Sequence, residues 1–194
     1  MVYRKTLKWN KLDLSKKIIE VQEQDKNSLQ TDLFDTLKIE NRKLVSAPEV
    51  GLPYNAIAFC SSLLGEKDNF VCLFNLDCSF SKGQEEFFQT CNTIPGLKAS
   101  IKRYSKVCIK SSNGERKLEI TGNLAAEFQK SIDFLHGKNL LTHLSPLKRK
   151  MYLNKFKKRL LKENKKGRDR EREIELKSLK KRKINKAKRK AKKK

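Results

Sequence analysis

The C-terminal quarter of this chain is too highly charged to contribute to an ordinary hydrophobic core. From Lys148 to Lys194 the sequence carries 25 basic and only 5 acidic residues. Beyond Gly167 its apolar residues are too sparse to offset the entropy of ordering, so we expect this part to be disordered or marginally helical until a partner binds. A polycation of this kind usually meets RNA, DNA or an anionic membrane surface. The alternative is a solvated tail that only aids solubility.

The rest of the chain has the charge balance of a soluble domain. Residues 1–147 hold 21 of the 46 basic and 17 of the 22 acidic residues. We therefore predict a domain over 1–147 and a basic C-terminal helix or tail over 148–194. The five cysteines are an odd number without a CxxC pair, which favours a reducing compartment. No apolar run reaches the ~20 residues of a membrane span, so we expect a cytoplasmic protein without membrane contact, an organellar matrix or an infected host's cytoplasm remaining open.

Hydrophobic periodicity predicts a mixture of helices and strands in the domain. Residues 27–41 and 123–137 have the spacing of amphipathic helices, and Ser145 and Pro146 can start a final helix. Apolar segments predict strands over 55–62, 69–80, 100–112 and 115–122, the last two joined by a turn at Asn113 and Gly114. This order of elements predicts an α+β fold.

Three segments carry a more specific pattern. They read LVSAPEVGLP at 44–53, QTCNTIPG at 89–96 and FQKSIDFLHG at 128–137, and LTHLSPLKR follows at 141–149. In this order and spacing they resemble the signature motifs of peptide deformylases, which are GxGLAAPQxG, EGCLSxPG and QHExDHLxG. The resemblance extends from residue 27 to about residue 160. It implies a fold of small β-sheets around a central buried helix, followed by a C-terminal helix.

The resemblance also implies a chemistry. The family removes the formyl group from the N-terminal formyl-methionine of new proteins, using Fe(II), often replaced by Zn or Ni. One cysteine and two histidines hold the metal, which acidifies a bound water. The glutamate beside the first histidine acts as general acid and base. The glutamine of the first motif and the backbone N–H after the cysteine stabilise the developing oxyanion.

Most of these reacting positions are replaced in this chain. Of the three metal-ligand positions, only Cys91 still holds a residue type that can bind the metal. The other positions hold residues of different chemistry: Lys130 and Phe134 stand for the histidines, Ser131 for the glutamate, Glu49 for the glutamine, and Asn92 follows the cysteine. The motif glutamate before the cysteine is Gln89, and the glycine-rich start of the first motif is Arg42-Lys43-Leu44. We therefore expect no metal, no other cofactor and no catalysis, and we expect Lys130 to pair with Glu49 across the former metal site.

Packing and turn positions of the motifs persist. They are Ala47, Pro48, Gly51, Cys91, Pro95, Gly96, Gln129, Asp133, Leu135 and Gly137. The two histidines of the chain do not replace the lost ligands. His136 lies six residues beyond Lys130, which turns it to another side of the helix, so we expect a surface or cap residue. His143 lies in the connector before the last helix.

The resemblance gives the tail a context, because bacterial deformylases are thought to dock on the ribosome with a basic C-terminal helix. We predict RNA or the ribosome as the partner, with protein partners and the oligomeric state left open. The basic clusters that would contact phosphates are Lys157, Lys158, Arg159, Lys165, Lys166, Lys180, Lys181, Arg182, Lys183, Lys188, Arg189 and Lys190. Aromatic residues are nearly absent after Phe156, which favours contacts with the phosphate backbone over base recognition.

Three functions remain in competition. The first is a catalytically inactive, deformylase-like protein of translation that binds RNA or the ribosome through its tail. The second is a working deformylase with an atypical site. The third is a viral or assembly structural protein whose tail binds nucleic acid. The missing histidine pair favours the first over the second.

Overall fold

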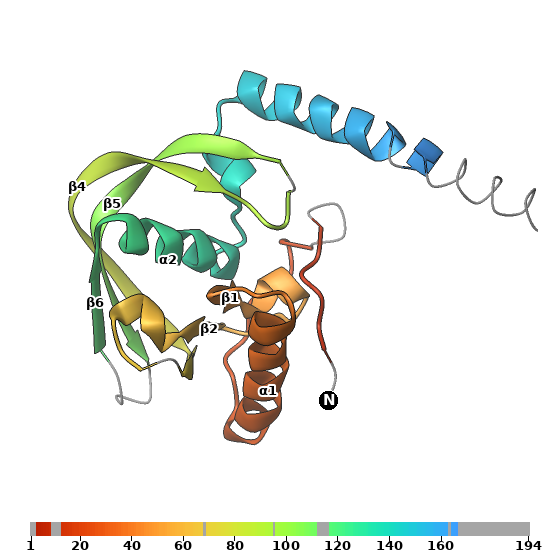
Figure 1. Cartoon of the computed structure of the whole chain (residues 1–194). Helices are drawn as coiled ribbons and strands as arrows, with labels where there is room; N and C mark the ends of the chain where they lie inside the picture. Colours follow the sequence, from red (N-terminus) through yellow and green to blue (C-terminus); the bar gives the residue numbers. More distant parts are fainter. Residues whose placement is uncertain are drawn as a thin grey trace, which may run out of the picture. The chain divides into compact units, whose positions relative to one another are not determined.

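The computed structural model describes residues 3–8, 13–67, 69–94, 96–111, 117–162 and 164–166 (Figure 1). The chain divides into two compact units, Met1–Ser145 and Pro146–Lys194. The predicted turn at Asn113 and Gly114, the motif residue Pro95 and the tail from Gly167 onward lie outside the described residues.

The larger unit contains two antiparallel sheets and a central helix. The first sheet has the order β1-β2-β3, with β1 at Leu44–Ser46, β2 at Ala56–Cys60 and β3 at Phe70–Phe74. The second sheet has the order β4-β5-β6, with β4 at Leu76–Thr90, β5 at Lys98–Ser111 and β6 at Lys117–Thr121. Helix α2, Gly122–Leu135, lies on the concave side of the curved β4–β5 arm (Figure 1). This confirms the predicted fold of small sheets around a buried helix.

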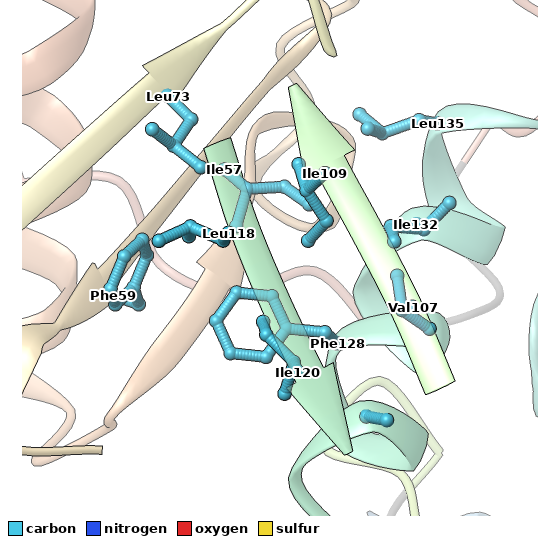
Figure 2. Close-up of a cluster of buried hydrophobic side chains, with 11 residues drawn as sticks. Ile57, Phe59, Leu73, Val107, Ile109, Leu118, Ile120, Phe128, Ile132 and Leu135 are labelled. Atoms are coloured by element: carbon cyan, nitrogen blue, oxygen red, sulfur yellow. The ribbon is translucent and has the colours of Figure 1, made fainter. Parts of the chain in front are cut away.

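Strand β2 separates two hydrophobic clusters because its side chains alternate between its faces. Ile57 and Phe59 face α2 and the second sheet, where Phe128 packs edge-on against Phe59 at 5.3 Å between ring centroids (Figure 2). Ala56 and Ala58 belong to the other cluster, which packs against helix α1, Glu23–Ile39. The residues of β2 are all buried, which explains why this strand reads as a continuous apolar run.

Helix α1 begins four residues before its predicted start and ends two residues before its predicted end. The first turn is polar, so the hydrophobic pattern does not indicate where the helix starts. Its Glu23 and Asp25 carboxylates interact favourably with the positive end of the helix dipole. The helix stops before Asn41, which takes a left-handed conformation with φ 49°. The predicted strand over 69–80 is likewise broken, at Asn75, which also has φ 49°. Its side chain bonds both the N–H and the carbonyl of Val21.

The second half of β4 was not predicted. Its sequence is polar through Ser81 and Glu86, yet it pairs with β5 to Thr90, with a register shift between Ser81 and Gln84. A strand that leaves one face to solvent needs few apolar residues, so the hydrophobic pattern is weak there.

The second unit begins with a helix. Residues 146–162 and 164–166 are helical, which agrees with the predicted start at Ser145 and Pro146. Within the described part of the chain, no helix has the length and apolar character that a bilayer crossing demands.

The motif glycine Gly137 ends α2 with a left-handed turn. Its φ is 67°, its N–H donates to the Phe134 carbonyl, and the next N–H, from Lys138, donates to the Asp133 carbonyl. These two bonds form a Schellman motif. A Cβ at this position would also lie 2.8 Å from the carbonyl oxygen of Leu14.

We expect Gly137→Ala to lower the free energy of unfolding by about 1–3 kcal/mol, because it adds a steric clash with backbone to a strained φ. Gly65→Ala is the matched control, since Gly65 has φ 76° but its Cβ would meet nothing within 4 Å. Urea unfolding of both variants measures the difference. Equal losses in the two variants would show that the contact with Leu14 is unimportant.

Candidate functional site

A cleft of about 270 Å³ lies where the three sequence motifs meet. The first motif and the residues just before it contribute Arg42, Lys43 and Leu44, the second contributes Thr90 and Asn92, and α2 contributes Leu124, Glu127, Lys130 and Ser131. Of the five replaced positions, Asn92, Lys130 and Ser131 line the cleft, although little of the Ser131 side chain is exposed. The replaced Glu49 and Phe134 and the retained Cys91 are buried and do not line it.

Glu49 is engaged on both carboxylate oxygens. Its Oε1 lies 2.8 Å from Nη2 of Arg42, and its Oε2 accepts from the Ser46 backbone N–H at 2.9 Å and from the Ser46 hydroxyl at 3.0 Å. Only 9% of the Arg42 side chain and 3% of the Glu49 side chain are exposed, so the ion pair is buried. The predicted pairing of Glu49 with Lys130 is wrong, because Arg42 lies closer in the fold and occupies the carboxylate.

The three members of this cluster all stand at departures from the first motif. Arg42 occupies the place of its first glycine, Ser46 that of an alanine and Glu49 that of the glutamine. The replacements bind one another, so they form one unit rather than three separate losses. A short helical turn at Ala47–Val50 holds the cluster, with Ser46 and Glu49 as its reciprocal cap.

Cys91 is a buried thiol with a local partner. Its Sγ lies 2.9 Å from the Thr93 hydroxyl oxygen, and its side chain is inaccessible in practice. Burial raises the pKa of the Cys91 thiol, and the nearby Glu49 charge acts in the same direction against the hydrogen bonds of Thr93 and Ile94. Without a metal, the thiol is therefore protonated at neutral pH and is not an activated nucleophile.

The α2 positions are also committed to other contacts. The Lys130 ammonium pairs with Glu127, one turn earlier on the same helix. Phe134 is 1% exposed and packs in the interior of the domain. His136 is the exposed C-cap of α2, as predicted for a residue that faces away from the site.

A buried polar network connects the second and third motifs, and the sequence did not indicate it. Arg103, on β5, donates from Nε to the side-chain oxygen of Gln89 at 3.0 Å. Its Nη2 lies 2.7 Å from Oδ2 of Asp133, and Nε2 of His143 lies 2.8 Å from the same oxygen. Burial alone raises the pKa of Asp133, but the hydrogen bonds of His143 and Arg103 and their charges lower it overall.

The retained Gln129 has a structural task. Its side chain accepts from the Tyr104 N–H at 3.0 Å and donates to the Tyr104 carbonyl at 2.7 Å. At Tyr104 these two bonds take the place of the backbone hydrogen bonds that a neighbouring strand would make with the free edge of β5. Gln129 and Asp133 therefore keep the arm and α2 together without touching a reacting atom.

The comparisons with known proteins agree with this architecture. The family model described as polypeptide deformylase matches residues 3–150. The chain belongs to the peptide deformylase family. It is 32% identical over 136 residues to a peptide deformylase of Thermodesulfovibrio yellowstonii, covering 69% of this chain and 82% of that protein. It is 27% identical over 140 residues to the peptide deformylase of Bartonella henselae, covering 70% and 80%.

A solved peptide deformylase structure from Legionella pneumophila matches with a TM-score of 0.72 and 27% identity, covering 84% of this chain and 98% of that chain. The match extends over nearly the whole length of that deformylase. The differences between this chain and the deformylase motifs therefore lie in side chains and not in missing elements.

The residues present do not fit the metal of the deformylase motifs. A Cys-His-His site needs three lone-pair donors that point into one space. Here the first histidine position holds an ammonium and the second an apolar ring, so only the cysteine of the three ligands remains. Among the described residues, no group of three His, Cys, Asp or Glu side chains could hold a metal ion.

Proposed function

We propose that this protein is a non-catalytic member of the peptide deformylase family that binds RNA, with the ribosome as the leading partner, through its basic C-terminal segment. The observation that carries the proposal is the fate of the reacting positions. Glu49, Lys130 and Phe134 are each engaged in a contact that has no place in water activation. The Glu49 carboxylate is also bound to Arg42 and Ser46 and has no N–H, so it cannot donate the hydrogen bond that the motif glutamine gives to an oxyanion.

The charge distribution supports RNA as the ligand. Of the formal net charge of +24, a net of +20 lies after residue 147. Lys157, Lys158, Lys165 and Lys166 lie exposed on the described helix. Lysine contacts with phosphates release counterions and give affinity that tolerates many sequences. We place this activity in a reducing, ribosome-containing compartment, either the cytoplasm or an organellar matrix.

We expect removal of residues 167–194 to lower RNA affinity strongly while the remaining chain stays folded. At least six basic residues that contact phosphates in the intact protein would give about a 10³-fold loss of affinity between 50 and 200 mM salt. Titrating labelled RNA into the intact and truncated proteins at several salt concentrations measures both effects. Circular dichroism of the truncated protein verifies that it is folded.

A full-length variant with a scrambled tail of the same composition is the control. A purely electrostatic tail binds equally well when scrambled, whereas a docked helix does not. Equal RNA affinity of the truncated and intact proteins, or binding that ignores salt, would contradict the assignment to the tail.

A working deformylase is the second candidate, because 32% identity to a peptide deformylase favours a shared activity. This candidate requires stoichiometric metal and turnover of a formyl-methionyl peptide, and both must depend on Cys91.

A further inference from the structure

The outer face of the β4–β5 arm combines exposed aromatic rings with lysines. Phe88 on β4 is 70% exposed, the largest exposed fraction of any aromatic side chain among the described residues. Tyr104 and Phe80 are 37% and 39% exposed, and their rings are stacked with centroids 5.5 Å apart. We call the set Phe80, Phe88, Lys98, Lys102 and Tyr104 the arm face.

The strand register places Phe88, Lys98, Lys102 and Tyr104 on one side. Phe80 lies opposite the buried Val107, beyond the register shift, and joins this face only through its ring, which stacks on Tyr104. Ala99, Ile101 and Arg103 are buried toward the domain, so the alternate residues Lys98 and Lys102 point outward with Tyr104. Phe88 lies opposite Ser100, between the two lysines along β5. Figure 1 shows the arm curving around α2, which occupies its concave side. Phe88, Tyr104 and the two lysines therefore share the surface that the domain does not cover.

We propose that the arm face binds single-stranded RNA by stacking bases on Phe88 and on the Phe80–Tyr104 pair, while Lys98 and Lys102 contact phosphates. The proposal rests on the RNA binding inferred above and adds a second site to it. Aromatic rings that alternate with cations are the surface on which single strands bind in many proteins. The tail has almost no aromatic residues, so stacking would come from the domain.

Charge favours RNA over a protein partner at this face. A protein interface centred on Phe88 would cover Lys98 and Lys102, and lysine is depleted in the buried centres of such interfaces. Phosphates instead pair with these ammonium groups. Glu86 lies opposite Lys102 on the same face, and its exposed carboxylate accepts a hydrogen bond from Ser100 at 2.9 Å. Its charge opposes an anion, and the two lysines outnumber it.

The test uses the full chain and labelled oligouridylate, with an RNA duplex of the same length for comparison. Bases inside a duplex are already stacked and are unavailable to a side chain. We expect Phe88→Ala to lower the affinity for the single strand by about fivefold or more and to leave the duplex affinity unchanged. The dependence of affinity on salt should not change, because no phosphate contact is lost.

Three further variants separate the contributions. Phe88→Trp should restore single-strand affinity, and Phe88→Leu should not, since leucine is apolar but has no ring to stack. Lys102→Gln should weaken both RNAs and reduce the salt slope by about one phosphate contact. Ile39→Ala is the matched control, because Ile39 is 60% exposed at the end of α1, away from the arm.

Several outcomes would overturn the arm face as an RNA site. They are unchanged oligouridylate affinity in Phe88→Ala, an equal loss for the duplex, or wild-type affinity of Phe88→Leu, which would show that no base stacks on the ring. The tail is tested separately. If the tail does not bind RNA, the salt-dependent RNA affinity survives the removal of residues 167–194, and Phe88→Ala still lowers the single-strand affinity. If the arm proposal fails, truncation removes RNA binding and Phe88→Ala has no effect.

Discussion

Replacing Glu49 with glutamine is expected to destabilise the folded protein by about 3 kcal/mol or more, although the two side chains have nearly the same shape. The Arg42 guanidinium donates to one carboxylate oxygen, and the Ser46 N–H and hydroxyl donate to the other. A glutamine has one acceptor and one donor group, so in either orientation its NH₂ faces a donor. The buried Arg42 charge also loses its counterion.

A double-mutant cycle with Arg42→Met isolates the pair. We expect each single variant to be destabilised and the double variant to lose less than the sum, with a coupling of about 1 kcal/mol or more. Urea unfolding gives the four free energies. Glu23→Gln is the control, since Glu23 pairs with Lys26 but its side chain is 87% exposed, so the expected loss is about 0–1 kcal/mol. Additive losses in the cycle would show that the two residues act independently.

The interaction between Arg42 and Glu49 explains why both positions differ from the deformylase motif together. The first motif has glycine where Arg42 stands and glutamine where Glu49 stands. Either replacement alone places an unpaired charge in the interior, which is costly. Both together give a satisfied ion pair that ties the first motif to the N-terminal segment, where Arg42 also donates to the Thr6 hydroxyl at 2.8 Å.

The sequence was sufficient where burial leaves a pattern. Helix α2 carries Phe128, Ile132 and Leu135 at helical spacing, and the structure buries all three. Strand β2 is apolar throughout because clusters lie on both its sides. The motifs gave the fold because their order and spacing survive even where their side chains changed.

The sequence was insufficient where polar groups find partners far along the chain. Arg103 and Asp133 lie 30 residues apart, one on a predicted strand and the other on the predicted central helix, and nothing in the local sequence indicates that they meet in the interior. Buried charge is rare unless paired, and the pairing follows from the fold rather than from local residue types. The same reason explains why Lys130 was assigned to Glu49 when Arg42 was the partner. The sequence did contain one indication of this pairing: Arg42, Ser46 and Glu49 all differ from the same motif, which suggests that they contact one another.

The intact protein is expected to bind no stoichiometric transition metal and to deformylate a formyl-methionyl peptide no faster than a no-enzyme control. Losing even a residue that orients a ligand typically costs about 10–100-fold in metal affinity, and here two ligands themselves are replaced. Elemental analysis after anaerobic reconstitution with Fe, Ni or Zn measures the metal, and release of formate measures turnover. Stoichiometric metal and turnover that both disappear in Cys91→Ala would establish the working deformylase instead.

A gain-of-function variant tests the same point from the opposite direction. Lys130→His, Phe134→His and Ser131→Glu return the ligands and the general base to α2, beside Cys91. The structure adds a requirement that the motifs alone do not reveal: Glu49→Gln must be accompanied by Arg42→Gly, because glutamine cannot satisfy both Arg42 and Ser46. Histidine is smaller than phenylalanine, so it fits the buried Phe134 position without overpacking.

We expect this five-residue variant to bind metal with a stoichiometry that falls to background when Cys91→Ala is added, because only a thiolate completes the ligand set. Metal binding itself favours that thiolate by lowering the thiol pKa, against the burial that raises it in the present protein. The four-residue variant that keeps Arg42 is the matched comparison. Its buried guanidinium faces a glutamine, so it should be less stable and hold metal more weakly. Equal metal binding by the four-residue and five-residue variants would show that Arg42 does not obstruct the restored site.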